Sequence, residues 1–420
     1  MDHPNANALI ASIVLPFFYA AVYLDAALAW WQRRDLYDWR DTVTSLGVAN
    51  LNTAIGVLSI LIRLAIYSAV YTHCALAQWP LAAWWTWAFG LLLYDYTYYW
   101  QHRMGHEWNL LWASHVVHHS SERFNLSTAL RVPTASMHLW TWLFALPLAV
   151  AGIPPTVYAV AALLNLLYQF WIHTERIGRL GWFDRCFGSP SNHRVHHGVN
   201  TPYLDKNYGG ILMLWDHLHG SYAEEREPVR YGTRDPVLSW NPLWVNLHTL
   251  TRLLRSASSM RWADRLRLGF RHPGWTPQGS RGVGDFDLGA ARFAVPVDHR
   301  IGEYALAQHA LMPAMVVHLI TLAPVVPIAD QLPYIAYLST AVLAIGLLMG
   351  SSPRQRQAGT ALEALRMLLT LWMATDLRWF GGLQLTPVAA GVIALAALLS
   401  LWALMRCRST VDGESISPAH

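Results

Sequence analysis

Charged side chains are scarce in this chain. Only 13% of its 420 residues are Asp, Glu, Lys or Arg, whereas soluble domains carry about a quarter. Hydrophobic residues make up 54% of the chain and the mean hydropathy is +0.23. Apolar runs long enough to cross a bilayer recur along the chain. The composition therefore argues against a soluble globular protein and predicts an integral membrane protein.

Cysteine and lysine are nearly absent. Cys74, Cys186 and Cys407 are far apart and form no CxxC pair, which excludes a disulfide framework and a thiolate zinc site. Lys206 is the only lysine, so the net charge of +4 comes from arginine. The arginines form short clusters beside apolar runs, as the positive-inside rule describes, and not one basic face. We therefore expect a membrane as a partner, and no nucleic acid.

The apolar runs predict an all-α fold, a polytopic bundle of about nine transmembrane helices. The expected spans cover about 8–30, 47–71, 80–100, 134–151, 154–173, 306–327, 332–350, 359–379 and 384–405. The first run is too long for a signal-peptide core and follows no positive charge, so we expect a retained anchor. Placing the clusters "WQRRDLYDWR", "SSPRQRQ" and "MRCRS" in the cytoplasm also puts residues 101–133 and 174–305 there.

Five segments are expected along the chain. They are N-terminal transmembrane anchor helices (1–79), a catalytic domain (80–225), a basic interfacial segment and linker (226–305), C-terminal transmembrane helices (306–408) and a polar tail (409–420). The third contains the amphipathic stretch "TRLLRSASSMRWADRLRLGF", which is typical of a helix lying on the inner leaflet. The sequence leaves open whether the two groups of spans share one bundle, and favours a structural or lipid-slot role for the last group.

Histidine is concentrated in the middle of the chain. Twelve of the 20 histidines lie between positions 102 and 219. Three clusters stand out: His102-x-x-x-His106, His115-x-x-His118-His119 and His193-x-x-His196-His197. Residues at i, i+3 and i+4 share one face of a helix and can reach a common metal. Eight imidazoles are too many for one ion, so the pattern predicts two metals in a cap beside the membrane. Imidazole suits zinc, copper, iron and nickel, so the ligands alone do not select the metal.

Other classes of function remain as alternatives. A haem protein needs paired histidines inside the spans, where only His138, His309 and His318 are clear candidates, and each is expected to be simply packed. A zinc-dependent membrane hydrolase would use similar clusters, but the chain has no HExxH, since the glutamate of "HRMGHE" follows the second histidine. A metal transporter needs ligands at mid-membrane depth, whereas these clusters flank the spans.

Four strings together resemble a known family. They are "DYTYYWQHRMGHEWNLLWASHVVHHSSERFNLSTALR", "QFWIHTE", "NHRVHHGVN" and "DKNYGGILMLWDHLHGSY". They are similar to the fatty acid hydroxylase / sterol desaturase superfamily, most of all to its alkylglycerol monooxygenase-like branch, over about residues 80–222. The resemblance implies a non-haem di-iron centre on the cytosolic face, with the eight histidines of the three clusters, called histidine boxes in this family, as ligands. It also implies that His173 is a further ligand or close neighbour and that Glu107 has a supporting role.

Further polar residues are candidates for holding the ligands in place. Asp95 lies two helical turns before His102, so it is expected to accept a hydrogen bond from a ligand imidazole. Asn125 and Asp216 are expected to act in the same way. His217 and His219 depart from the family pattern, which more often has Arg and Phe there, and their role stays open.

The resemblance implies an O2-dependent di-iron monooxygenase that hydroxylates a lipid C–H bond, in first place on an alkylglycerol or other ether lipid. Sterol or fatty-acyl desaturation or hydroxylation is the nearest alternative. The implied cofactors are two iron ions. The sequence has no flavin, haem or ferredoxin motif, so electrons are expected from an external donor, either tetrahydrobiopterin or a separate redox protein. The expected location is a bacterial inner membrane, with the histidine boxes on the cytoplasmic face.

Overall fold

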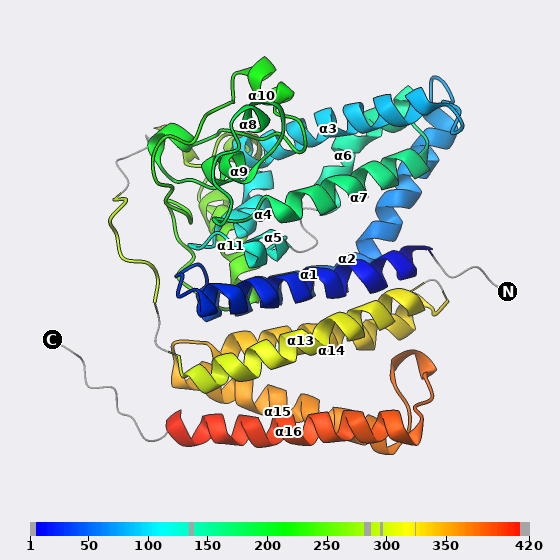
Figure 1. Ribbon diagram of the computed structural model, residues 1–420, viewed down its shortest axis with the longest axis vertical. Helices are drawn as coiled ribbons and strands as arrows, with labels where there is room; N and C mark the ends of the chain where they lie inside the picture. Colours follow the sequence, from blue (N-terminus) through cyan, green and yellow to red (C-terminus); the bar gives the residue numbers. More distant parts are fainter. Residues whose placement is uncertain (1–5, 134–137, 281–286, 295–296, 324, 412–420) are drawn as a thin grey trace.

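Long helices lie side by side and carry a compact cap at one end (Figure 1). The computed structural model describes residues 6–133, 138–280, 287–294, 297–323 and 325–411. Within these residues the fold is helical, which confirms the predicted class. One two-stranded hairpin, β1 (Trp275–Thr276) with β2 (Gly279–Ser280), is the exception among the described residues. It lies in the Pro/Gly-rich linker, where turn-forming residues interrupt helices.

The first half of the chain supplies the helices that support the cap. They are α1 (Ala6–Trp31), α2 (Trp39–Cys74), α3 (Trp84–Glu107), α6 (His138–Ala151) and α7 (Pro155–Trp171). Asp38 starts α2 by accepting a hydrogen bond from the backbone N–H of Arg40. Pro155 occupies the first turn of α7. Backbone N–H groups there have no partner inside the helix, so the missing N–H of proline costs no hydrogen bond.

The second half adds four long helices to the same bundle. They are α13 (His299–Leu322), α14 (Ile328–Leu348), α15 (Pro353–Thr375) and α16 (Pro387–Val411), with a short turn η2 (Phe380–Gly382) before the last. Helix α13 packs against α1 and α2, and α15 and α16 cover its far side (Figure 1). The two groups of helices therefore share one bundle, a point that the sequence left open.

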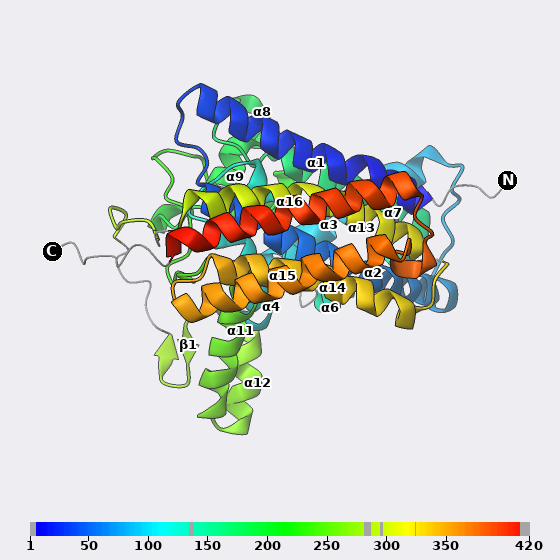
Figure 2. The same cartoon turned by 90° about the horizontal axis from the view of Figure 1, so that it is seen from below.

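The cap consists of short helices between the long ones. They are α4 (Asn109–His119), α5 (Leu126–Leu130), α8 (Trp182–Cys186), α9 (Pro190–His196), η1 (Thr201–Tyr203) and α10 (Leu214–His219). Two further helices, α11 (Pro242–Ser258) and α12 (Trp262–Phe270), run across the direction of the long helices and project from the bundle (Figure 2). Helix α12 packs against α4.

Four helices are long and apolar enough to cross a membrane, among the residues that could be searched. Their spans are Ile13–Trp31, His299–Leu322, Ile328–Leu348 and Pro387–Cys407. Helix α6 has 14 residues and α7 has 17, about 21 and 26 Å at 1.5 Å per residue. These are short for the roughly 30 Å hydrocarbon layer. A membrane-bound helical fold is thus confirmed, while nine crossings remain a prediction.

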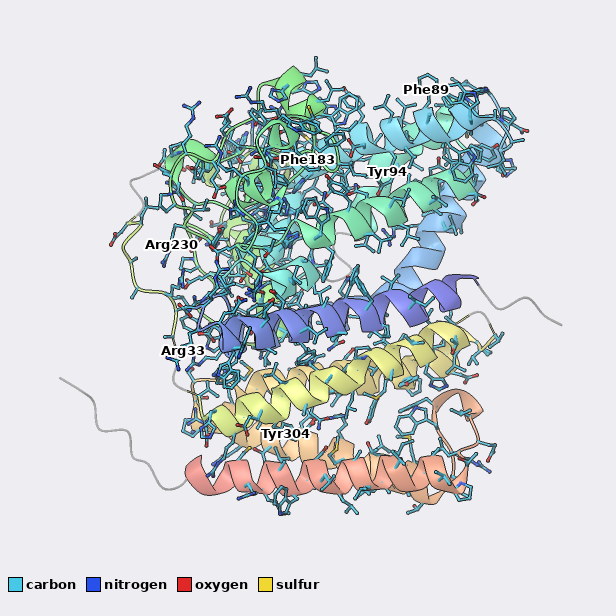
Figure 3. The ribbon with its side chains drawn as sticks, viewed as in Figure 1. Arg33, Phe89, Tyr94, Phe183, Arg230 and Tyr304 are labelled. Carbon is cyan, nitrogen blue, oxygen red and sulfur yellow. The ribbon has the colours of Figure 1, made fainter. Side chains whose placement is uncertain are left out.

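The arginine-rich segments gather at the cap end of the bundle. Arg33 follows α1, Arg354 and Arg356 lie in the first turn of α15, and Arg406 lies in the last turns of α16. Figure 3 labels Arg33 at that end and Phe89, in α3, toward the other. All three histidine clusters lie at the arginine-rich end, so the expectation that they share one side agrees with the fold.

Candidate metal centre

One group of histidines joins three helices. Helix α3 contributes His102 and His106, α4 contributes His115 and His119, and α9 contributes His196. One nitrogen of each imidazole lies within 4.8 Å of those of the other four. All five residues are buried.

A second group lies beside the first. It consists of His118 from α4, His173 just after α7, His193 from α9 and His197 directly after α9. Sequence neighbours are divided between the groups, since His118 and His119 belong to different groups, as do His196 and His197. Adjacent residues on a helix point in directions about 100° apart, so each HxxHH segment contributes to both groups. All nine histidines expected as ligands are thereby brought together.

The nitrogen spacings within the second group are close to those of a coordination shell. His193 Nε2 lies 2.9 Å from His173 Nε2 and 3.2 Å from His197 Nε2. His118 Nε2 lies 3.2 Å from His173 Nε2 and 3.1 Å from His197 Nε2. Two nitrogens bound to one ion at 2.0–2.1 Å are about 2.9 to 3.4 Å apart, for angles between 90° and tetrahedral. The four atoms are thus spaced as ligands of a single ion would be.

Backbone carbonyls orient three of the imidazoles. The Nδ1 atoms of His102, His173 and His196 lie 2.9, 2.7 and 3.0 Å from the carbonyl oxygens of Tyr208, Gln169 and Lys206. A carbonyl only accepts, so each Nδ1 carries the proton and donates it. The lone pair of each ring then sits on Nε2, where it can bind a metal.

Burial keeps the cluster neutral. It lowers the pKa of His119, His193, His196 and His197 well below the ordinary value, and neighbouring imidazoles lower it further. Burial also lowers the pKa of His173 to about 4. A protonated imidazole is unfavourable here because the charged form would lose its hydration. The rings are therefore available as neutral nitrogen ligands at neutral pH.

The donor set fits bound metal. The Nε2 atoms of His106 and His196 are buried and have no hydrogen-bond partner among the described residues. Several neutral lone pairs directed at one another are unfavourable unless a cation lies between them. Both groups contain histidine alone, and the carboxylate nearest to His106 Nδ1 is the half-exposed Asp205, at 3.9 Å. Nitrogen ligands without thiolate are compatible with iron, zinc or copper.

Asp95 and Asp216 act on a backbone loop instead of on an imidazole. Asp95 accepts hydrogen bonds from the N–H groups of Ile211 and Leu212 and from the Trp215 indole, at 2.8 to 3.1 Å. This differs from the expected bond to an imidazole, because the face of α3 that carries Asp95 meets residues 210–215. Asp216 accepts from the N–H of Tyr208 at 2.8 Å and of Gly209 at 2.6 Å. Together they hold the segment whose Tyr208 carbonyl orients His102.

Two glycines let these carboxylates approach the loop. A Cβ on Gly209 would lie 2.8 Å from the Asp216 carboxylate and 2.6 Å from the Leu212 carbonyl. One on Gly210 would lie 2.8 Å from the Asp95 carboxylate. The "NYGG" motif is therefore required by close packing of acidic side chains against the backbone.

The other two polar candidates have different partners. Asn125 caps α5, since its side chain accepts from the N–H of Ser127 at 3.0 Å and donates to the Leu36 carbonyl at 2.8 Å. Glu107 accepts from Arg103 Nε at 2.7 Å, next to the first box. Neither makes a hydrogen bond to an imidazole among the described residues. They act on α5 and on the end of α3, and not directly on an imidazole.

The remaining histidines lie outside both groups. His217 Nε2 lies 3.0 Å from the Arg185 carbonyl, and His219 stacks on Tyr99 with ring centroids 5.2 Å apart. In the bundle, His309 Nδ1 lies 2.9 Å from Asn50 Nδ2, and His318 lies beside Tyr334. The side chain of His138 lies outside the described residues. No haem-type pair forms among those that are described.

Phe124 and Tyr208 are parts of the site that sequence reasoning missed. Phe124 is fully buried, stacks on His173 at 5.5 Å, and lies 5.2 Å from His197. The Tyr208 ring lies 5.3 Å from that of His106. The one signal for either residue is its position inside a quoted string, Phe124 in the first and Tyr208 in the last. Phe124 shields the second group from water.

Comparison with known proteins identifies the family to which the chain belongs. The family model described as fatty acid hydroxylase matches residues 87–221, which include all nine clustered histidines. Alkylglycerol monooxygenase of Homo sapiens is 34% identical over 369 residues, covering 85% of this chain and 81% of the relative. The chain belongs to the fatty acid hydroxylase family. Membership makes it a membrane-bound oxidoreductase that hydroxylates lipids, and the histidine groups form the only nitrogen-rich clusters in the matched, described region.

Other relatives within the family show its range. Alkylglycerol monooxygenase of Xenopus tropicalis is 32% identical and covers 85% of this chain and 80% of the relative. Ornithine lipid hydroxylase OlsE of Rhizobium tropici is 30% identical but covers 47% of this chain and 61% of the relative. No solved structure matches this chain. The similarity to the alkylglycerol monooxygenases extends well beyond the matched family domain, into the C-terminal helices.

Proposed function

We propose that this chain is a di-iron monooxygenase that uses O2 to hydroxylate an alkylglycerol or similar ether lipid. The observation that carries the proposal is the division of nine histidines, eight of them buried, into two groups of metal-ligand spacing. The substrate class is supported by the long match to alkylglycerol monooxygenases. A hydroxyl added beside an ether oxygen gives a hemiacetal, which releases an aldehyde and free glycerol. The bacterial inner membrane and a cytoplasmic cap are part of the same proposal.

In this proposal, His102, His106, His115, His119 and His196 hold one iron, and His118, His173, His193 and His197 hold the other. When bound, the two irons would supply O2 activation, with two electrons from tetrahydrobiopterin or a redox protein. The chain's own residues keep the ligands neutral by burial and fix their tautomers through backbone carbonyls. Phe124 and its stacked partner Tyr231, 5.0 Å apart, exclude water from one side.

Helices α11 and α12 are proposed to rest on the membrane surface beside the cap. They run across the long helices (Figure 2), and they expose Trp244, Leu254, Trp262, Leu266 and Phe270. Arginines lie between these apolar residues, as in helices that bind anionic bilayers. Since α12 packs against α4, a lipid leaving the bilayer there would be close to the histidine groups.

The proposal is tested by paired variants at neighbouring positions. His196→Ala and His197→Ala each remove one ligand from a different group, so each purified protein is expected to lose about half of its iron. Elemental mass spectrometry measures the iron, and aldehyde release from an alkylglycerol under O2 measures activity, which both variants are expected to lose. His217→Ala, outside both groups, serves as the control and keeps both. Stoichiometric zinc without iron in the unaltered protein would instead favour a hydrolase.

A further inference from the structure

Exposed apolar side chains gather on a second part of the cap, away from α11 and α12. On α10, Leu214 and Leu218 are both more than half exposed and lie one helical turn apart on the same face. On α8, Trp182 is 71% exposed, and the exposed Cys186 lies one turn after it on the same face. Large apolar side chains exposed together mark a contact with a membrane or with another molecule.

The two short helices are fastened to each other. The backbone N–H of Met213, which precedes α10, donates to the Cys186 carbonyl at 3.0 Å. An isolated antiparallel β-bridge joins Phe187 to Leu212. Both helices lie side by side at the outer edge of the cap (Figure 1). They therefore form one surface, the α8–α10 surface, which consists of Arg179, Leu180, Trp182, Arg185, Cys186, Leu214 and Leu218.

The α8–α10 surface continues a side of the bundle that faces lipid. Helix α10 lies against the cap-end half of α3, where the rings of Trp215 and Tyr96 are 4.7 Å apart. Farther along α3, Trp84 and Phe89 are exposed, and Figure 3 labels Phe89 on the outer side of that helix. Figure 2 shows α8 and the pair α11 and α12 on opposite sides of the bundle, at a similar level along the long helices. A bilayer around those helices therefore reaches the α8–α10 surface.

The charges of this surface are arranged as at the boundary of a bilayer. The side chains of Arg179 and Arg185 are 56% and 69% exposed, whereas Glu224, which lies 3.6 and 3.4 Å from them, is 27% exposed. Glu225 is turned inward and accepts from Arg194 at 2.7 Å. Among these groups the cations therefore reach farthest out. Long arginine side chains at a membrane surface extend to lipid phosphates while their apolar neighbours lie deeper.

We propose that the α8–α10 surface rests on the bilayer, opposite α11 and α12. Trp182, Leu214 and Leu218 lie at the boundary between headgroups and hydrocarbon, and Arg179 and Arg185 lie at lipid phosphates. Tryptophan suits this boundary because its ring is apolar and its N–H is polar. The inference concerns how lipid holds the cap, and it stands whichever reaction the metal centre performs.

The two lipid contacts flank the first histidine group. Helix α12 packs against α4, and α10 lies against α3. These two helices, α3 and α4, supply four of the five histidines of that group. Contact with lipid on both sides keeps this group at the depth of the headgroups, where a lipid chain approaches it without leaving the bilayer.

The test places a fluorophore on the α8–α10 surface of the full-length protein in lipid nanodiscs. Cys74→Ser leaves Cys186 as the exposed cysteine, because Cys407 is buried. Cys186 is then labelled with the fluorophore NBD. Lipids with a nitroxide at the headgroup end of the acyl chain are expected to remove about half of the fluorescence, since interfacial groups enter the bilayer by about 5–10 Å. Lipids with a nitroxide at the methyl end, and iodide in water, are expected to quench less.

Arg230→Cys, combined with Cys74→Ser and Cys186→Ser, is the matched control. Figure 3 labels Arg230 closer to the cap end of the molecule than Phe183 of α8. A label there is expected to be quenched by iodide and not by lipid nitroxides. Equal lipid quenching at both positions, or none at Cys186, would overturn the proposal. Protection of Cys186 from lipid nitroxides and iodide alike would place a protein, such as a second copy of the chain, on this surface and would overturn it as well.

A double variant tests the apolar side chains themselves. Trp182→Ser with Leu218→Ser removes two exposed side chains, so quenching at Cys186 by the nitroxide at the headgroup end is expected to fall toward the value of the Arg230 control. Iron content is expected to be kept, which shows that the cap is intact. Leu395→Ser, at an exposed position of α16, is expected to leave the quenching unchanged. Undiminished quenching in the double variant would count against the proposal.

Discussion

At the scale of single residues, the direction in which each histidine side chain points decides which group it joins. His196 and His197 are adjacent, yet they belong to different groups because successive helical residues point in different directions. Spacing in the sequence therefore predicted that the imidazoles meet a metal, but not which imidazoles meet each other. Tautomers depend on carbonyls of residues 169, 206 and 208, which no local pattern reveals.

Acid is expected to destabilise the metal-free protein through these same residues. The pKa of His173 is about 4 in the folded chain and about 6.5 when unfolded. Between these values the unfolded chain binds a proton that the folded chain does not, so stability falls as pH falls from about 6.5 toward 4. For His173 alone the loss is roughly 3 kcal/mol, at 1.36 kcal/mol per unit.

The measurement is the unfolding temperature of chelator-treated protein in detergent, at pH 7.5 and pH 5. His173→Gln, which cannot titrate, is expected to show a weaker dependence on pH. Equal unfolding temperatures at both pH values for the unaltered protein would contradict the assignment of buried, neutral imidazoles.

At the scale of elements, the loop 207–213 is positioned by α3 and α10. Asp95 holds the N–H groups of residues 211 and 212, and Asp216 holds those of residues 208 and 209. The sequence placed both aspartates near the ligands, but their bonds depend on a loop more than 100 residues away from Asp95. The "NYGG" glycines complete this arrangement by permitting close approach.

Asp95→Asn is expected to loosen that loop. An amide presents N–H donors where the carboxylate accepted three hydrogen bonds, so the Tyr208 carbonyl loses its fixed position against His102. Groups that orient metal ligands typically affect affinity or activity by about 10- to 100-fold. Iron content and alkylglycerol turnover measure the effect, with Asp264→Asn on α12 as the control. Full iron and full turnover in the Asp95 variant would show that the loop does not need this anchor.

A network of polar side chains lies inside the C-terminal helices, which the sequence presented as apolar. Arg366 in α15 donates to Glu363 at 2.5 and 2.9 Å and to Gln308 in α13 at 2.8 Å. Tyr304, labelled in Figure 3, donates to Glu363 at 2.6 Å. Charges inside spans are costly unless paired, and here every bond is made within the bundle. The network ties α13 to α15.

Arg366→Ala is expected to destabilise the bundle by about 3–5 kcal/mol, because Glu363 would remain buried without its partner. The double variant Glu363→Leu with Arg366→Met removes both charges and is expected to recover most of the loss. Thermal unfolding in detergent measures both, and iron content, which should not change, separates this effect from the metal centre. If the double variant were no more stable than the single one, the ion pair would not be the cause.

At the scale of the whole molecule, the two ends of the bundle differ. The cap end carries arginines and all nine clustered histidines, whereas the other end carries short connections. Two exposed cysteines mark these ends, with Cys74 at the end of α2 and Cys186 on α8 in the cap. These two cysteines can therefore report how the bundle is oriented in the membrane.

A membrane-impermeant maleimide is expected to label Cys74 in intact cells and Cys186 only after the membrane is opened. Cys74→Ser and Cys186→Ser assign each signal, and Cys407 is buried and should react with neither treatment. Labelling of both cysteines from outside would contradict the proposed orientation and place the cap on the outer face.

The sequence by itself determined the class of the protein, its long helices and the histidines that are expected as ligands. These follow from local properties, since hydropathy over some 20 residues decides a span and i, i+3, i+4 spacing decides a shared face. Tertiary structure alone decided that the nine histidines form two groups, that Asp95 and Asp216 hold a loop, and that both sets of helices form one bundle. Each depends on contacts between segments far apart in the chain, whose relative orientation follows from packing and is not encoded in any short pattern.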